Sequence, residues 1–460
     1  METKNQEIAS PRRQDGPRRY LPVFLLLGAY LLLTTRLFVL ISRDAVNILF
    51  WDQWDFDDAT LFQQHSLWQM FRWQHGWHRQ GLGALLQKVA EPCIHWNGRS
   101  EAFLIGVLFV VVSVLALLLK VRLYGGVGYS DVVVPLLFLS PLQYETLVWS
   151  PNPSQGALPL LLAVLYGFSW LIRTYSWKYT CMLIVNFFLI YSGFGIFIGP
   201  VTPVLLALDY YANTRHSAAR HRWGTAGAFA ISIASLASFF VGYGFTMGVD
   251  CPAPAPKNPL AYPPFIALMF AHAGGFRALS LPLASLLGSV ALFLFLVALA
   301  STTKGLFTRR SDQWPRDAAI AGLLAYSAIF CLNASYARMC LGLAAAATSR
   351  YTPYVILGLF GVYLYALSIR RPGVRARFIL VLMVFAVFGA CPLNRSDTSN
   401  NDIFNRGKRA WRECYLARHD IYGCNAVTNF KIYPHPEATH LQEKLDFLER
   451  NHLNLYDNSQ

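Results

Sequence analysis

Long apolar runs are the feature that most constrains how this chain can fold. A membrane hydrocarbon core about 30 Å thick needs about 20 apolar residues in a helix, so runs of roughly 16 or more with almost no charge predict transmembrane spans. The fifth and sixth runs below are short and separated only by Gly193-Phe194-Gly195, so they could form one re-entrant hairpin instead. We predict an all-α, polytopic integral membrane protein with about eleven transmembrane helices. The runs are 20–41, 102–119, 131–147, 156–172, 179–193, 196–211, 225–245, 283–300, 318–334, 353–370 and 378–393.

The composition supports a membrane protein. Of the 460 residues, 55% are hydrophobic and only 14% are charged, whereas soluble globular chains carry about 25% charged residues. These proportions exclude a soluble enzyme and a disordered protein. The net charge of +14 fits anionic lipid better than nucleic acid in a chain this apolar, so we expect a lipid bilayer as partner and no nucleic acid.

Basic residues between the spans predict the orientation. If the N-terminus is cytoplasmic, every short loop on that face carries Lys or Arg, as the positive-inside rule requires. The opposite connectors 143–155 and 246–263 hold a single basic residue, Lys257. We therefore expect a multi-pass protein of the bacterial inner membrane, with a cytoplasmic N-terminus and a periplasmic C-terminus.

The chain divides into three parts. We expect residues 1–19 to form a basic cytoplasmic arm, 20–393 the transmembrane domain with a first outer loop at 42–101, and 394–460 a small outer C-terminal segment. A leucine stripe in that segment predicts a helical cap docked on the outer face. Cys414 and Cys424 fit a disulfide in an oxidising compartment, and Cys93 with Cys251 is a weaker second pair.

The first outer loop carries a dense group of carboxylates among tryptophans: Asp52, Asp55, Asp57 and Asp58. Tryptophan prefers the membrane–water interface, so this loop should lie on the bilayer as short amphipathic helices. Asp52 and Asp55 would share a helix face. Crowded, partly desolvated carboxylates repel one another, which raises a pKa and can produce a general base. A solvated acidic cap is the alternative, and which Asp is the base stays open.

His75, His78 and Arg79 follow in the sequence HGWHR. Histidines three apart on a helix could bind a metal, but Gly76 weakens a helix there and no third ligand has matching spacing. We favour hydrogen bonding and positive charge offered to an anionic substrate. Histidines that only pack are the alternative.

The last outer connector carries Arg338 and Arg350 beside Tyr351. Guanidinium groups bind phosphate oxygens in bidentate fashion, so two arginines at the outer rim could hold a lipid phosphate. Arginines that only snorkel to the interface are the alternative. Glu145, in an earlier outer connector, falls on the same predicted side. Convergence of these polar groups on one side predicts a single site there.

These motifs resemble those of GT-C type glycosyltransferases, the polytopic class that uses polyprenyl-phosphate sugars as donors. The order WDQWD and HGWHR after the first span, QYETLVW, GFG, and SRY near the end is also similar to a broad group of bacterial multi-pass membrane proteins. The resemblance covers most of 20–393.

The resemblance implies roles for residues and partners. Asp52 or Asp55 would be the catalytic base, and Arg338 and Arg350 would grip the donor phosphate. The partners would be a polyprenyl-phosphate-linked sugar donor and a glycan or lipid acceptor. This chain has WDQWD where familiar members have adjacent acidic residues, and Asp57-Asp58 is its one adjacent pair in that segment. The need for a divalent cation, Mg²⁺ or Mn²⁺, therefore stays open.

Two other classes of function compete with a transferase. A transporter or flippase for a lipid-linked or anionic substrate would place charges near mid-span and repeat broken helices in two halves. A non-catalytic membrane assembly protein would tolerate loss of every aspartate in 52–58.

Overall fold

The computed structural model describes residues 20–63, 65–214, 218–245, 259–308, 313–391 and 395–457, so the predicted arm 1–19 lies outside the described residues. Helices make up 80% of the described residues, which confirms the all-α expectation. Within the described residues the one sheet is a hairpin of two short strands, β1 (Gln74–His75) and β2 (His78–Arg79).

Seven helical stretches among the described residues are long and apolar enough to cross a membrane. They identify the chain as a multi-pass integral membrane protein. Six of them contain α1 (Leu21–Asp44), α5 (Gly98–Tyr124), α12 (Leu281–Thr308), α13 (Trp314–Arg338), α14 (Thr352–Ser368) and α15 (Pro372–Gly389). The seventh is Gly193–Asn213, which contains the helical turn η7 (Gly193–Ile198) and α9 (Val201–Asp209).

The finer expectation of about eleven spans differs from these seven. The predicted span 131–147 breaks into α6 (Val133–Phe138) and the helical turns η5 (Pro141–Gln143) and η6 (Glu145–Trp149). Proline has no amide hydrogen, so Pro141 cannot continue a regular helix from α6. The helices in two further runs are α7 (Ala157–Ser169) and α8 (Tyr175–Ile190), with 13 and 16 residues. At 1.5 Å per residue both are shorter than a membrane core. The run at 225–245 is α10 (Ala219–Phe239).

One buried helix, α11 (Tyr262–Ala273), is absent from the predicted spans because its 12 residues are too few for a span-length run. It packs closely against α12 at Gly288. A Cβ added at Gly288 would lie 1.8 Å from the carbonyl oxygen of Ala267. Glycine is therefore required for these two backbones to approach.

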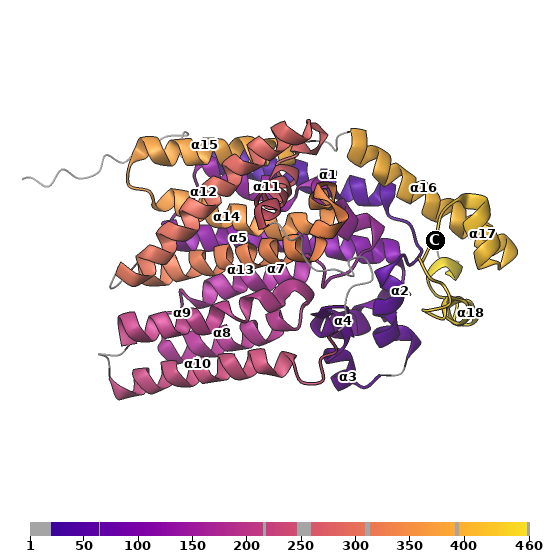
Figure 1. The fold of residues 1–460 in the computed structure, drawn as a ribbon, viewed down its shortest axis with the longest axis horizontal. Coiled ribbons are helices and arrows are strands. Elements are labelled where there is room, and N and C mark those ends of the chain that lie inside the picture. Colours follow the sequence, from indigo (N-terminus) through magenta and orange to yellow (C-terminus); the bar gives the residue numbers. More distant parts are fainter. Residues whose placement is uncertain are drawn as a thin grey trace, which may run out of the picture.

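The short elements of the first outer loop lie with the C-terminal helices at one end of the helix bundle, at the right of Figure 1. We call this the loop end. The first loop forms short helices, as expected. The elements at the loop end are α2 (Asp52–Asp57), η2 (Asp58–Phe62), α3 (Leu67–Phe71), α4 (Gly81–Ala90), η3 (Glu91–Ile94), α16 (Arg395–Arg418), α17 (Ile421–Thr428) and α18 (Leu441–Arg450).

The C-terminal segment shares a hydrophobic core with the first loop. Trp54 of α2 is fully buried in a cluster with Trp411 of α16 and with the predicted leucine stripe of α18, namely Leu441, Leu445 and Leu448. The Cys414–Cys424 disulfide joins α16 to α17. Cys93 is free, so its expected pairing with Cys251, which lies outside the described residues, is wrong. The predicted cap is thus docked directly on the aspartate-bearing loop.

Candidate functional site

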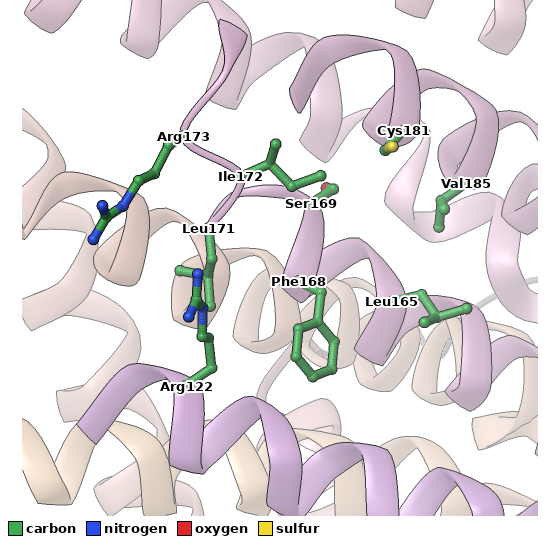
Figure 2. Close-up of a pocket in the computed structure, with 9 residues that line it drawn as sticks. All are labelled: Arg122, Leu165, Phe168, Ser169, Leu171, Ile172, Arg173, Cys181 and Val185. Carbon is green, nitrogen blue, oxygen red and sulfur yellow. The ribbon is translucent and has the colours of Figure 1, made fainter. Parts of the chain in front are cut away.

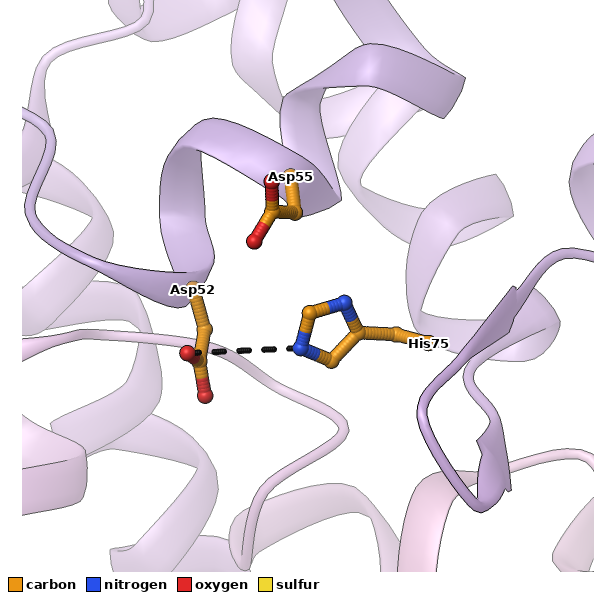
Figure 3. Close-up of side chains that lie close together, drawn as sticks. All are labelled: Asp52, Asp55 and His75. Atoms are coloured by element: carbon orange, nitrogen blue, oxygen red, sulfur yellow. Dashed lines mark ion pairs between the residues drawn. The ribbon is translucent and has the colours of Figure 1, made fainter. Parts of the chain in front are cut away.

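Two aspartates of α2 and one histidine of β1 form a compact cluster. One ligand atom each from Asp52, Asp55 and His75 lies within 4.8 Å of the others. The His75 Nε2 is 4.0 Å from Asp52 Oδ1, and these two side chains are 29% and 33% exposed. Figure 3 shows the imidazole directed toward both carboxylates. The expected shared face of Asp52 and Asp55 is confirmed, and His75 joins them from a distant element.

The backbone before Asp52 helps to fix the position of α2. Trp51 has φ 49 and ψ −121, a conformation that a bulky residue rarely adopts and that is strained. The amide of Trp51 donates to the carbonyl of Ile432 at 3.2 Å, and the amide of Phe50 donates to Gln53 Oε1 at 3.1 Å. Trp54 and Phe56 are buried, so α2 is anchored through its apolar side chains and keeps Asp52 and Asp55 half-buried.

The two aspartates of the cluster differ in the number of hydrogen bonds that their carboxylates accept. Asp55 accepts hydrogen bonds from the Tyr433 hydroxyl at 3.1 and 3.0 Å and from Thr439 Oγ1 at 3.2 Å. Asp52 accepts one, from Gln155 Nε2 at 3.4 Å. Burial, followed by the Asp55 carboxylate, raises the pKa of Tyr433, so the phenol keeps the proton it donates. The Asp52 carboxylate can therefore accept a hydrogen bond from a further donor more readily than the Asp55 carboxylate can.

An ion pair joins the other two connectors predicted on the same side as this cluster. Arg350 Nε lies 3.6 Å from Glu145 Oε1, and the Arg350 amide donates to Glu145 Oε2 at 3.2 Å. Ser349 reinforces the junction, because its hydroxyl accepts from the Glu145 amide and donates to the carbonyl of Leu142. Tyr351 is only 5% exposed, and its ring packs against Phe330.

His78 links the acidic cluster to the arginines. Burial, followed by the positive charges of His75, Arg338 and Arg350, lowers the pKa of His78 to about 3. The imidazole is therefore neutral at physiological pH. Its Nδ1 is buried without a hydrogen-bond partner in the described part of the chain. Both predicted phosphate-binding arginines thus lie within electrostatic reach of the histidine hairpin.

The Gly193-Phe194-Gly195 break lies next to this hairpin. The Phe194 ring centroid is 4.1 Å from that of His78. Gly193 has φ +66, and a Cβ there would lie 2.4 Å from the carbonyl oxygen of Ser154. A side chain at this position would push η7 away from the connector that carries Gln155. Glycine therefore keeps the predicted outer segments in contact.

Three residues expected to bind substrate have other partners. Arg79 is 2% exposed and donates to the carbonyls of Arg72, Phe239 at 2.7 Å and Val241 at 2.9 Å, which fixes the hairpin to the end of α10. Three of the five N–H donors of Arg79 are used in these bonds, and its burial leaves the other two little access to a substrate. These hydrogen bonds disfavour the substrate contact predicted for Arg79, which stays a prediction.

The adjacent pair Asp57 and Asp58 also has other partners. Asp57 is fully buried and accepts from Gln87 Nε2 at 2.9 Å and Thr60 Oγ1 at 3.3 Å, and its burial raises its pKa to about 7. Asp58 pairs with Lys444 of α18 at 2.9 Å. Both carboxylates therefore have structural partners, and their substrate contacts stay predictions.

Sequence reasoning missed the residues that come from distant segments. Tyr433 and Thr439 contact Asp55 across separations of 378 and 384 positions, and no sequence signal pairs them. Arg277 follows the unexpected helix α11 and forms a 2.8 Å ion pair with Asp397 at the start of α16. Its position between two apolar segments is the sequence signal that marks it.

The cluster has the donor set of a divalent-cation site. Two carboxylates and an imidazole suit Mn²⁺, and carboxylate oxygens also suit Mg²⁺. The three ligand atoms are close enough to converge on one ion. The sequence matches no protein-family model and no curated protein sequence.

Proposed function

We propose that this protein is a GT-C type membrane glycosyltransferase that moves a sugar from a polyprenyl-phosphate donor to an acceptor hydroxyl at the outer face. One observation carries the proposal. The Asp52–Asp55–His75 cluster lies at the loop end, where Arg338 and Arg350 act electrostatically on His78 of the same hairpin. A base and fixed cations at one membrane rim are what transfer from a lipid phosphate requires.

Asp52 is the base in this proposal, because its carboxylate has fewer hydrogen-bond donors than that of Asp55. The acceptor oxygen forms a bond to the anomeric carbon while Asp52 takes the hydroxyl proton. The bond between that carbon and the phosphate oxygen breaks, and its electron pair leaves with the polyprenyl phosphate. Arg338 and Arg350 stabilise the phosphate charge through charge-assisted hydrogen bonds.

A divalent cation fits the same cluster without replacing these roles. Asp52, Asp55 and His75 would hold it, and it would add positive charge beside the leaving phosphate. Tyr433 and Thr439 hold Asp55 in place from the C-terminal segment. Asp55 is thus assigned to positioning and Asp52 to proton transfer. A bound cation would be shared by both carboxylates and the His75 imidazole.

The test measures release of polyprenyl phosphate by mass spectrometry from proteoliposomes supplied with donor and candidate acceptors. Asp52→Asn should lower turnover by about 10²- to 10⁴-fold, the range typical of a lost general base, while donor binding is retained. Asp446→Asn, which changes an exposed carboxylate of α18, should behave like wild type. Unchanged turnover by Asp52→Asn would refute the proposal and favour a non-catalytic role.

The arginines are tested through binding of the donor. Arg338→Ala should weaken the donor Kd at least about tenfold, as expected for a lost charged hydrogen bond, with the acceptor Kd nearly constant. Arg338 is preferred to Arg350 because Arg350→Ala would also leave Glu145 without its ion-pair partner. Equal weakening of donor and acceptor binding would contradict a phosphate role.

A further inference from the structure

A hollow of about 590 Å³ lies at the end of the bundle opposite the loop end, between α5, α7 and α8. Its walls are largely apolar. Figure 2 shows the side chains that face it. The volume is within the range of sites that hold small molecules or single lipid chains. The apolar lining includes Leu165, Phe168, Leu171, Ile172 and Val185.

Two arginines flank this hollow on the same side. Arg122 is in the last turn of α5, and Arg173 is in the connector between α7 and α8. Both side chains are exposed. Among the described residues, no carboxylate lies within ion-pair distance of either guanidinium, and no side chain or carbonyl accepts a hydrogen bond from either.

The acidic residues of the neighbouring segments already form ion pairs with other basic side chains. Asp131 pairs with Lys120 at 2.7 Å, Asp209 with Lys178 at 2.7 Å and Asp317 with Arg316 at 3.1 Å. All three aspartates are buried. In the part of the chain that the structure describes, these are the acidic residues between α5 and α14 other than Glu145, which lies at the loop end. Among the described residues, no acidic side chain of this region is therefore left to pair with Arg122 or Arg173.

We propose that the α5–α7–α8 hollow binds an anionic phospholipid of the leaflet opposite the loop end. One acyl chain fills the apolar hollow, and the headgroup phosphate binds Arg122 and Arg173. Guanidinium matches phosphate in bidentate geometry. Arginines that only snorkel would lie on an apolar surface without a hollow, and no single lipid would stay bound to them during purification. Arg122 and Arg173 instead flank a hollow large enough for one acyl chain.

The test counts lipids retained by the full chain, released from nanodiscs of phosphatidylcholine containing phosphatidylglycerol, by native mass spectrometry. Each basic side chain near an anionic surface contributes about 1 kcal/mol, or about a fivefold gain in affinity. The double variant Arg122→Gln/Arg173→Gln should therefore bind phosphatidylglycerol about 30-fold more weakly. The control Arg370→Gln/Arg371→Gln removes two exposed arginines between α14 and α15, away from the hollow, and should retain the lipid.

A second variant leaves both charges in place. Cys181 lines the hollow from α8, so Cys181→Phe should fill the space and displace the lipid without altering the arginines. Equal loss in the two double variants, equal retention of phosphatidylcholine by the wild-type chain, or undiminished retention of phosphatidylglycerol by Cys181→Phe would each overturn the proposal.

Discussion

Lys444 forms a polar link between the C-terminal segment and the first loop, and its removal provides a quantitative test. Its ammonium lies 2.9 Å from Asp58 Oδ1 and donates to the Trp54 carbonyl at 2.8 Å and to Thr439 Oγ1 at 2.6 Å. Lys444 is 5% exposed. Lys444→Met keeps most of the aliphatic volume and removes all three polar contacts.

The magnitude follows from the groups left behind. Removing one partner of a buried ion pair costs about 3–5 kcal/mol, because the other charge stays desolvated. Asp58 is 26% exposed, so solvent screening places the cost at the lower end, about 3 kcal/mol. At 1.4 kcal/mol per factor of ten, the undocked state of the C-terminal segment becomes about a hundredfold more populated.

Hydrogen exchange followed by mass spectrometry measures this population directly. Amides of α18 should exchange about a hundredfold faster in Lys444→Met, because exchange from a locally opened state reports its free energy. Turnover should fall as well, since Tyr433 and Thr439 leave Asp55 when the segment undocks. Lys431→Met, at an exposed lysine of the same segment, is the matched control. Exchange in Lys444→Met within threefold of wild type would refute this account of the joint.

Three further predictions concern single features of the loop end. The pKa of Asp57 is raised from 3.8 to about 7, so the free energy of unfolding of the wild type falls as pH rises from about 4 to 7. Relative to wild type, the free energy of unfolding of Asp57→Asn should increase by about 3 kcal/mol between pH 5 and 7. A difference that does not change with pH would contradict this prediction. Cys414→Ser with Cys424→Ser should destabilise the C-terminal segment by about 2–3 kcal/mol, measured as faster exchange of α17 amides. Arg79→Gln should loosen the hairpin from α10 and increase proteolysis near 240, whereas protection like that of wild type would contradict its structural role.

The sequence predicts the location of the polar groups well because membranes penalise charge. Asp52, His75, Glu145 and Arg350 could each be assigned to one side from the spans and the basic loops alone. Their mutual approach at the loop end follows from that shared side. The docking of α18 was also predictable, because its leucines recur with helical periodicity.

The remaining features depend on tertiary contacts that leave no local pattern. Tyr433 contacts Asp55 from a segment whose neighbouring residue, Ile432, accepts a hydrogen bond from the strained backbone at Trp51. The helix α11 was missed because a short buried helix inside a bundle need not span the bilayer. Spacing placed Arg79 beside the histidines, but it could not show that three carbonyls would occupy its guanidinium.

The most direct test of the central claim is photo-crosslinking with a polyprenyl phosphate that carries a diazirine beside its phosphate. The claim is that the lipid phosphate binds where the aspartate cluster and the outer arginines meet. Peptide mapping should place the crosslinks in 51–80, 144–155 and 338–351, and unlabelled polyprenyl phosphate should compete. Crosslinks confined to the opposite end of the bundle, around 122 and 165–185, would contradict the account.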